Sequence, residues 1–267
     1  MLTLFASILT GCNGGPGGLV GGYGEDSWAH FEGGGIFDGG TPSMSPDGTT
    51  LVYSSPCSGR GDVVRVNRDG TGRVKLAGSD DYEAHPIYSP DGARIAYVRE
   101  HAGDRHIWSM NSDGTGKTQL TFGGVLDDIG EFSPDGSRIH FDRSQQTGGG
   151  GRFPKPYVMQ SDGKSLRPRP VKPESVVKDG VASPDGKHIY FVSRPYARDL
   201  CVRDADGARE RILPAPDGYK TVPRFSPDGR TLLIGVLTKG QRMTHIALID
   251  VTREEVAGVL RDDCGAE

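Results

Sequence analysis

The 267-residue chain has few of the side chains that build a large core, because apolar residues make up 34% and aromatic residues 7%. None of its apolar runs approaches the roughly 20 residues that a membrane-spanning helix needs. Basic residues are not in excess either, since 31 Lys and Arg stand against 35 Asp and Glu, which gives a net charge of −4. Phosphate binding needs clustered basic side chains, so this balance argues against a nucleic-acid partner.

The signatures of common catalytic sites are also missing. The sequence contains no G-x-S-x-G, H-E-x-x-H, P-loop or C-x-x-C motif. Nothing therefore marks a nucleophile, a zinc site or a phosphate-binding loop.

Glycine is abundant instead, with 41 residues, and one tetrapeptide recurs. Ser-Pro-Asp-Gly occurs five times, and successive copies begin 44, 44, 50 and 43 residues apart. The copies are Ser45–Gly48, Ser89–Gly92, Ser133–Gly136, Ser183–Gly186 and Ser226–Gly229. Such a period is close to that of four-stranded propeller blades, so the repeats predict one all-β domain built from a repeated unit.

Each repeat predicts four antiparallel strands. Proline and glycine in the tetrapeptide suit a type I turn with a bulge, and the serine oxygen can accept a backbone N–H within that turn. An Asp-Gly pair such as Asp113-Gly114 then closes a second hairpin in the first four repeats. The strand between the two turns, for example Ile95–Val98, is apolar on both faces, which predicts sheets that are packed from both sides.

The residue before each turn is expected to wedge between neighbouring sheets. It is apolar or aromatic in four repeats, at Met44, Tyr88, Phe132 and Phe225. Ala182 occupies the same place in the fourth repeat, which predicts looser packing there.

The pattern Pro-x-(Phe/Tyr)-Ser-Pro-Asp-Gly, followed by an apolar strand and an Asp-Gly hairpin, resembles the PD40, or WD40-like, repeat of the TolB propeller family. The resemblance covers about residues 41 to 261. It implies a closed β-propeller of the bacterial periplasm or cell envelope, used mostly to bind proteins. We expect five blades, with six as the alternative. The expected blades are about 41–79, 85–122, 129–170, 179–214 and 222–261.

The first residues indicate export and lipid anchoring. Residues 2–9 form an apolar run like the centre of a signal peptide, and the following Leu9-Thr10-Gly11-Cys12 resembles a bacterial lipobox. We expect a lipoprotein signal peptide over 1–12 with lipidation of Cys12, a Gly-rich tether over 13–40 and the propeller over 41–264. The protein would then lie in the periplasm or at the cell surface and touch a membrane only through its lipid.

Three further cysteines follow. A disulfide between Cys57 and Cys264 is expected, because both fall on one face of the first and last blades, which ring closure makes neighbours. Cys201 is expected to be a buried single thiol.

Acidic residues gather in the expected connections between blades. With one histidine among them, they are Asp80, Asp81, Glu83, His85, Asp127, Asp128, Asp179 and Asp217. If they converge, they form a face for a cationic segment of a partner or hold a divalent cation through carboxylate oxygens. The alternative is that they are solvated loop side chains. His101, Asp104 and His106 flank the outer loop of the second blade, where solvated histidines are more common than a metal pair.

The insertion from Gln145 to Pro156 is expected to be a mobile loop, which either carries recognition or is an unconstrained excursion. These features favour a non-catalytic, lipid-anchored scaffold that binds an envelope protein or peptide through its loop face, without a cofactor. The alternatives are an enzyme of lyase or hydrolase type with a site in the central channel, and a metal-stabilised structural propeller.

Overall fold

The computed structural model describes residues 42–55, 57, 61–145, 154–169, 180–193, 199–237 and 244–261. Every regular element in these ranges is a β-strand. Within them, no helix is present that could cross a membrane.

The strands form five successive units, each with four strand positions. Unit 1 contains β1 (Ser43–Met44), β2 (Thr50–Ser55), β3 (Asp62–Asn67) and β4 (Val74–Ala77). Unit 2 contains β5 (Tyr82–Tyr88), β6 (Arg94–His101), β7 (Asp104–Asn111) and β8 (Thr118–Gln119). Unit 3 contains β9 (Val125–Phe132), β10 (Arg138–Gln145), β11 (Lys155–Gln160) and β12 (Arg167–Pro168). Unit 4 contains β13 (Gly180–Ala182), β14 (His188–Val192), β15 (Leu200–Asp204) and β16 (Glu210–Leu213). Unit 5 contains β17 (Tyr219–Lys220), β18 (Arg224–Phe225), β19 (Thr231–Leu237), β20 (Thr244–Asp250) and β21 (Glu255–Arg261).

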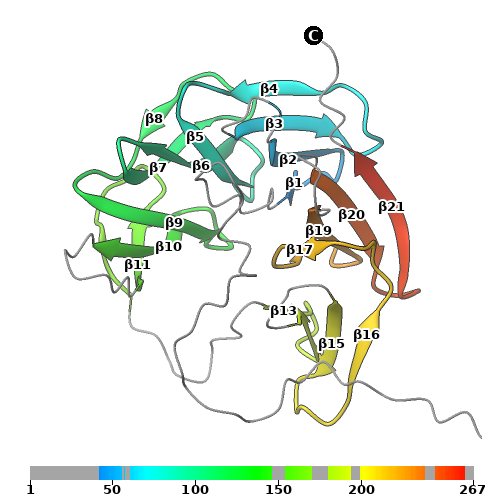
Figure 1. The fold of residues 1–267 in the computed structure, drawn as a ribbon. Helices are drawn as coiled ribbons and strands as arrows, with labels where there is room; N and C mark the ends of the chain where they lie inside the picture. The colour runs from blue at the N-terminus through cyan, green and yellow to red at the C-terminus, as the bar shows by residue number, and fades with distance from the viewer. Residues whose placement is uncertain are drawn as a thin grey trace, which may run out of the picture.

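Within each unit, strands that follow one another pair antiparallel, and in unit 5 the two short strands β17 and β18 both pair with β19. A single parallel contact between Arg105 and Leu126 joins units 2 and 3 into one eight-stranded sheet. The units fan around a common centre, and unit 1 lies beside unit 5 (Figure 1). The predicted four-stranded antiparallel sheets are confirmed.

All five Ser-Pro-Asp-Gly segments form the same turn. In each, the glycine N–H donates to the serine carbonyl at 2.8 or 2.9 Å, and the glycine φ lies between 69° and 73°. The serine hydroxyl donates to the aspartate Oδ1 at 2.6 Å and accepts the N–H of the residue five positions on. The predicted acceptor role of serine is confirmed. The aspartate also accepts the N–H two residues further on, a bond that the sequence reasoning did not include.

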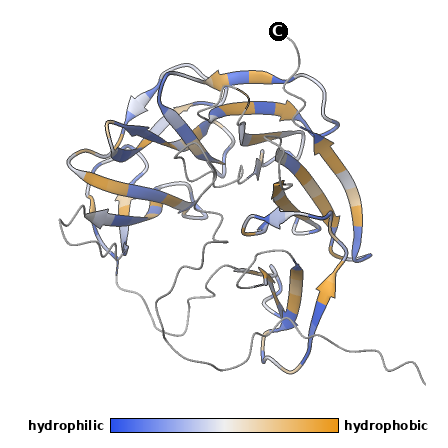
Figure 2. Cartoon of the chain, viewed as in Figure 1, coloured by the Kyte–Doolittle hydropathy of each residue, from blue (hydrophilic) through white to orange (hydrophobic). Residues whose placement is uncertain are grey.

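Apolar clusters fill the spaces between neighbouring units, where apolar strand segments face one another (Figure 2). Each cluster can be identified by two of its members: Val63 and Ile95 between units 1 and 2, Ile107 and Ile139 between units 2 and 3, Val202 and Ile234 between units 4 and 5, and Leu51 and Leu233 between units 1 and 5. The residues expected to wedge between sheets, Met44, Tyr88, Phe132 and Phe225, all lie in or against these clusters.

The space between units 3 and 4 is different. In the part of the chain that the structure describes, no apolar cluster joins these two units. Strand β14 buries Tyr190 and Val192 toward unit 5, whereas Ile189 and Phe191 on its other face stay half-buried. The expectation of two buried faces therefore holds for β2, β6 and β19 but not for β14.

The predicted starts of two blades are wrong. Strand β5 begins at Tyr82 rather than near residue 85, and β9 begins at Val125 rather than near residue 129. Each start contains two polar residues, Glu83 and His85 in β5 and Asp127 and Asp128 in β9, which resemble a loop in composition. Both strands nevertheless pair with strands that carry an arginine. The residues 13–40 and the middle of the 145–156 insertion lie outside the described residues.

Candidate functional site

The inner strands of units 2 and 3 carry buried carboxylates that are held by arginine. Asp127 on β9 is fully buried, and Arg143 on β10 contacts both its oxygens, with Nε 2.7 Å from Oδ1 and Nη2 2.8 Å from Oδ2. Glu83 on β5 is also buried, and its Oε1 lies 3.9 Å from Nε of Arg99 on β6. Burial raises the pKa of Glu83, and the Ser79 hydroxyl and Arg99 offset this only in part.

Arg99 is the centre of a larger group on the same face of unit 2. Its Nε and Nη2 lie 2.8 Å and 2.7 Å from Oδ2 of Asp81, while Nδ1 of His101 lies 2.8 Å from the other oxygen of that carboxylate. Burial opposes ionisation of Asp81, but the hydrogen bonds from His101 and Arg99 outweigh it and lower the pKa of Asp81. The guanidinium also stacks over Trp108, 5.0 Å from the ring centroid.

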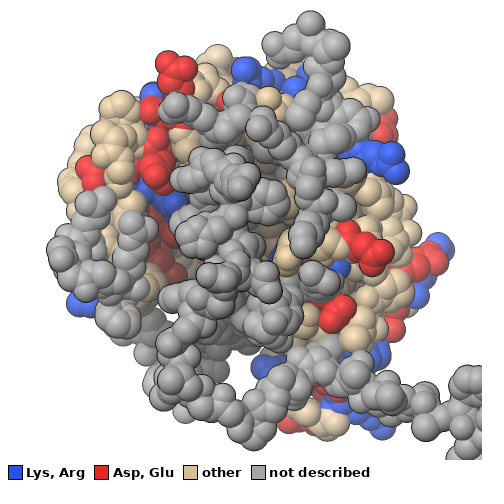
Figure 3. Space-filling view, viewed as in Figure 1, with Lys and Arg blue, Asp and Glu red and all other residues tan. Residues whose placement is uncertain are grey.

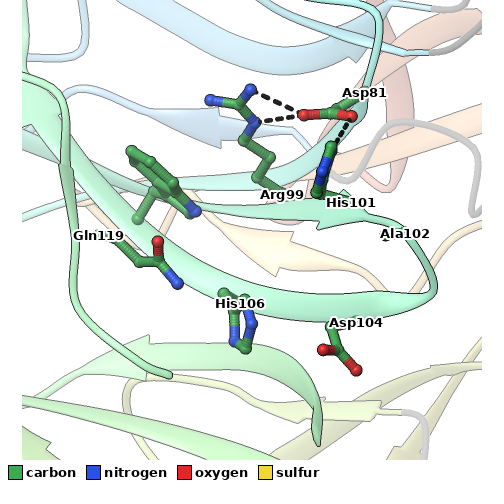
Figure 4. A pocket seen from close by; sticks show the side chains of 8 residues that line it. Asp81, Arg99, His101, Ala102, Asp104, His106 and Gln119 are labelled. Atoms are coloured by element: carbon green, nitrogen blue, oxygen red, sulfur yellow. Dashed lines mark hydrogen bonds and ion pairs between the residues drawn. The ribbon is translucent and has the colours of Figure 1, made fainter. Parts of the chain in front are cut away.

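A pocket of about 360 Å³ opens beside this group. Strand register explains its lining, because Arg99 faces His106, and His101 faces Asp104 across β6 and β7. Gln119 on β8 faces Trp108 and completes the wall. Figure 4 shows Arg99, Asp81 and His101 on one side of the opening and His106, Asp104 and Gln119 on the other.

The pocket lies at one end of the unit, which we call the connection face. This end carries the links between units at residues 78–81, 121–124 and 214–218, whereas the Ser-Pro-Asp-Gly turns lie at the other end. On the viewed side of the molecule, acidic side chains are visible over unit 2 (Figure 3).

An exposed aromatic side chain, Phe122, lies on the link that follows the pocket residue Gln119. Phe122 is 66% exposed, the highest value among the large apolar side chains of the described residues. Its backbone is tied down on both sides, because Thr121 Oγ1 accepts the Ile107 N–H at 2.9 Å and the Val125 N–H donates to the Gly123 carbonyl at 2.9 Å. The Thr121 carbonyl accepts the side-chain amide of Gln119, a pocket residue, at 2.8 Å.

A second charged group lies on the opposite face of unit 2, toward unit 3. Asp128 Oδ1 accepts a hydrogen bond from Nη1 of Arg105 at 2.8 Å and lies 3.7 Å from Nδ1 of His85. Arg105 also donates to Glu100 at 3.0 Å. Burial alone would lower the pKa of Arg105, but these two carboxylates raise it.

The eight residues expected to share an acidic face are therefore split into smaller groups. Arg99 joins Asp81 to Glu83, and Asp128 approaches His85, whereas Asp127 is held by Arg143 alone. Asp80 and Asp217 are exposed, and Asp179 lies outside the described residues. The placement of four of them in connections was wrong, because these four lie inside strands: Glu83 and His85 in β5, and Asp127 and Asp128 in β9.

Across the ranges given above, no three His, Cys, Asp or Glu side chains are grouped so that they could hold a metal ion. His101, Asp104 and His106 do not form such a group, although strand register places them on one side of the β6–β7 hairpin. The described residues of this site present charged groups, hydrogen-bonding groups and the ring of Trp108.

Cys57 and Cys201 are both disulfide-bonded. The expectation that Cys201 is a single thiol was wrong, because this fully buried side chain is oxidised rather than a lone small apolar group. Cys12 and Cys264 lie outside the described residues, so the expected lipidation of Cys12 and the expected pairing of Cys57 with Cys264 stay predictions.

Sequence reasoning missed the arginines, Trp108, Gln119 and Phe122. A usable signal existed for the arginines, since Arg99 and Arg143 both come ten residues after the turn serine of their repeats. Glu83 and Asp127 both come six residues before it. No comparable signal existed for the pocket, which depends on the register of three strands.

Comparison with known proteins identifies the fold. The family model described as PD40, the TolB β-propeller domain, matches residues 41–252. A comparison with curated proteins finds no match. Among solved structures, TolB from Acinetobacter baumannii is 21% identical with a TM-score of 0.46, and the alignment covers 82% of this chain and 55% of that one. An oligogalacturonate lyase from Vibrio parahaemolyticus is 17% identical with a TM-score of 0.41, covering 79% of this chain and 65% of that one.

Neither structural likeness is close enough to bear on the activity of this chain. The family match is stronger evidence for the fold family, because it spans most of the sequence and includes all five turn motifs. The chain belongs to the TolB β-propeller domain family.

Proposed function

We propose that the chain is a non-catalytic propeller that binds a protein or peptide of the cell envelope through its connection face. The observation that carries this proposal is the presentation of Phe122. Phe122 is 66% exposed on an anchored backbone, so its apolar surface stays in water, and burying that surface against a partner would be favourable.

The charged groups around the pocket support the same role. Asp81 is held by both Arg99 and His101, so the rim is arranged before a ligand arrives. Preorganised side chains lose less conformational entropy on binding than free ones. A surface of this kind suits recognition of a short segment rather than bond cleavage.

Five blades are the count that we propose for the ring. Leu51 of unit 1 and Leu233 of unit 5 share one buried cluster, which leaves the first and last units in direct contact. An experimental density map with a sixth four-stranded sheet between them would contradict this count.

We further propose that the protein is exported and anchored in a bacterial envelope membrane by a lipid on Cys12. The lipobox-like Leu9-Thr10-Gly11-Cys12 is the support for this step. Cells grown with a fatty-acid tracer should label the wild-type chain, and the label should disappear in Cys12→Ser. Label that persists in Cys12→Ser would overturn the anchor while leaving the binding role open.

Site-specific photo-crosslinking tests the binding role. A benzophenone amino acid at position 122 should capture a partner from envelope extract. The same group at position 212 is the control, because Ile212 is also an exposed apolar residue, at 49%, but lies on β16 of unit 4. The captured band should be specific to position 122 and should weaken in a chain that carries Trp108→Ala.

Two results would reverse the proposal. One is equal capture at positions 122 and 212, which would mean nonspecific contact. The other is turnover of a glycan or peptide by the purified chain with no partner captured, which would favour the enzyme hypothesis.

A further inference from the structure

The pocket of unit 2 contains a carboxylate without a counter-charge. Asp104 is half-buried, and its carboxylate has neither a hydrogen bond nor an ion pair to any residue that the structure describes. The other carboxylate of the lining, Asp81, is bound by Arg99 and His101. Since Arg99 is already engaged, the lining keeps one uncompensated negative charge and offers no uncompensated arginine or lysine. Such a site attracts a cationic group.

The rest of the lining suits a guanidinium. Trp108 already stacks against the guanidinium of Arg99 at 5.0 Å, and aromatic faces favour such cations. Gln119 donates its side-chain amide to the Thr121 carbonyl, which leaves its Oε1 as an acceptor. A carboxylate and an amide oxygen together match the several N–H donors of a planar guanidinium better than they match a single ammonium.

The size of the pocket limits the ligand. About 360 Å³ is at the lower end of the range for small-molecule sites and fits one long side chain with some water rather than an oligosaccharide. Phe122 is exposed on the link that runs from the pocket residue Gln119 to Val125. An apolar residue next to the cation in the same segment can therefore lie against Phe122.

We propose that the pocket binds an arginine side chain of the partner segment, with an adjacent apolar residue of that segment on Phe122. This rests on the proposed binding role of the connection face and adds the chemistry of the partner. The charge match is with Asp104, and Oε1 of Gln119 can accept a further N–H of the guanidinium.

The test uses a small probe, acetyl-Arg-Leu-amide, and the full chain with Trp28→Phe, so that Trp108 gives the one indole N–H signal in the NMR spectrum. The probe should shift that signal in a saturable way. Acetyl-citrulline-Leu-amide has nearly the same shape without the charge. We expect it to bind about two- to fivefold more weakly than the arginine probe, as the loss of one ion pair implies. Asp104→Asn should weaken the arginine probe by a similar factor.

The matched control is Glu131→Gln, which removes one charge from an exposed residue of unit 3, away from the pocket. It should leave the affinity for the arginine probe unchanged. Equal binding of the arginine and citrulline probes to the wild-type chain would overturn the proposal, and this comparison does not depend on the folding of any variant. No shift with either probe would also overturn it.

The outcome can be separated from that of the proposed function. Capture at position 122 without arginine-selective binding would leave the connection face as a binding surface and remove only the arginine. Arginine-selective binding with equal capture at positions 122 and 212 would keep the pocket and remove the larger partner.

Discussion

Arg143 holds both oxygens of the fully buried Asp127 carboxylate, at 2.7 and 2.8 Å, across the two inner strands of unit 3. Arg99 and Glu83 take the same two repeat positions in unit 2. The pairing is looser there, at 3.9 Å, because Arg99 is shared with Asp81. Units 2 and 3 therefore share an acid on the first strand and an arginine on the second, next to the connection face, and the other three repeats have neither at these positions.

Arg143→Met is expected to destabilise the fold by about 3 kcal/mol, because removing one partner of a buried pair leaves a buried charge without compensation. Urea unfolding followed by circular dichroism measures the change. Arg138→Met on the same strand is the control, since Arg138 is exposed, and its effect should stay within about 0.5 kcal/mol. Equal effects of the two substitutions would contradict a structural role for the Asp127 pair.

The five turn aspartates predict a loss of stability in acid. Hydrogen bonds from the turn serine and from nearby backbone N–H groups lower the pKa of Asp47, Asp91, Asp135, Asp185 and Asp228. For Asp135 the pKa falls to about 2. A carboxyl whose pKa is lower in the folded state contributes stability above its unfolded value of about 3.9 and loses it as the pH falls through the folded value. The free energy of unfolding should therefore decline between about pH 4 and pH 2.

Asp135→Asn tests this assignment, because the amide does not titrate in that range. The variant should be less stable than the wild type at pH 7 and should lose less stability between pH 4 and pH 2. Asp217→Asn, at an exposed aspartate outside the turns, should keep the wild-type profile. Parallel profiles for the wild type and Asp135→Asn would assign the acid sensitivity to other groups.

Much of the fold was predictable because one local rule repeats. Ser-Pro-Asp-Gly sets its turn through bonds among neighbouring residues, so the hairpins and the strands beside them follow from the sequence. The starts of β5 and β9 were not predictable by composition, since Glu83 and Asp127 are buried only because an arginine faces each of them. The pocket was also out of reach, because Asp104, Trp108 and Gln119 come together only through tertiary register.

The second turns of the units predict where the ring is tight. A Cβ on Gly114 of unit 2 would lie 3.1 Å from the Leu76 carbonyl oxygen of unit 1, whereas a Cβ on Gly207 of unit 4 would meet no atom within 4 Å. Both glycines have positive φ, at 90° and 79°. Gly207→Ala should therefore cost only the backbone strain of about 1 kcal/mol. Gly114→Ala should cost at least about 1 kcal/mol more, because the methyl group crowds the neighbouring unit.

Denaturant unfolding of the two variants side by side checks this difference. Equal losses of unfolding free energy would mean that unit 2 accommodates the extra methyl group as easily as unit 4 does. A larger loss at Gly207 would contradict the room that a Cβ at Gly207 has among the described residues.

The cysteines give a prediction that tests the expected disulfide between Cys57 and Cys264. In a purified chain that carries no lipid, an alkylating reagent under denaturing, non-reducing conditions should modify neither Cys57 nor Cys201, because both are disulfide-bonded. Cys12→Ser should then expose one thiol, and peptide mapping identifies it. If it is Cys201, Cys57 pairs with Cys264 and ties the first unit to the last.

Lipidation of Cys12 would have the same effect on the thiols, because a thioether occupies the sulfur that a disulfide needs. The lipidated chain has three cysteines left, and an odd number cannot all pair within one chain. We therefore expect the lipidated protein to expose one alkylatable thiol, or a disulfide to another molecule, at the residue that Cys12→Ser exposes. A lipidated chain that exposes a different residue from the one that Cys12→Ser exposes would contradict this expectation.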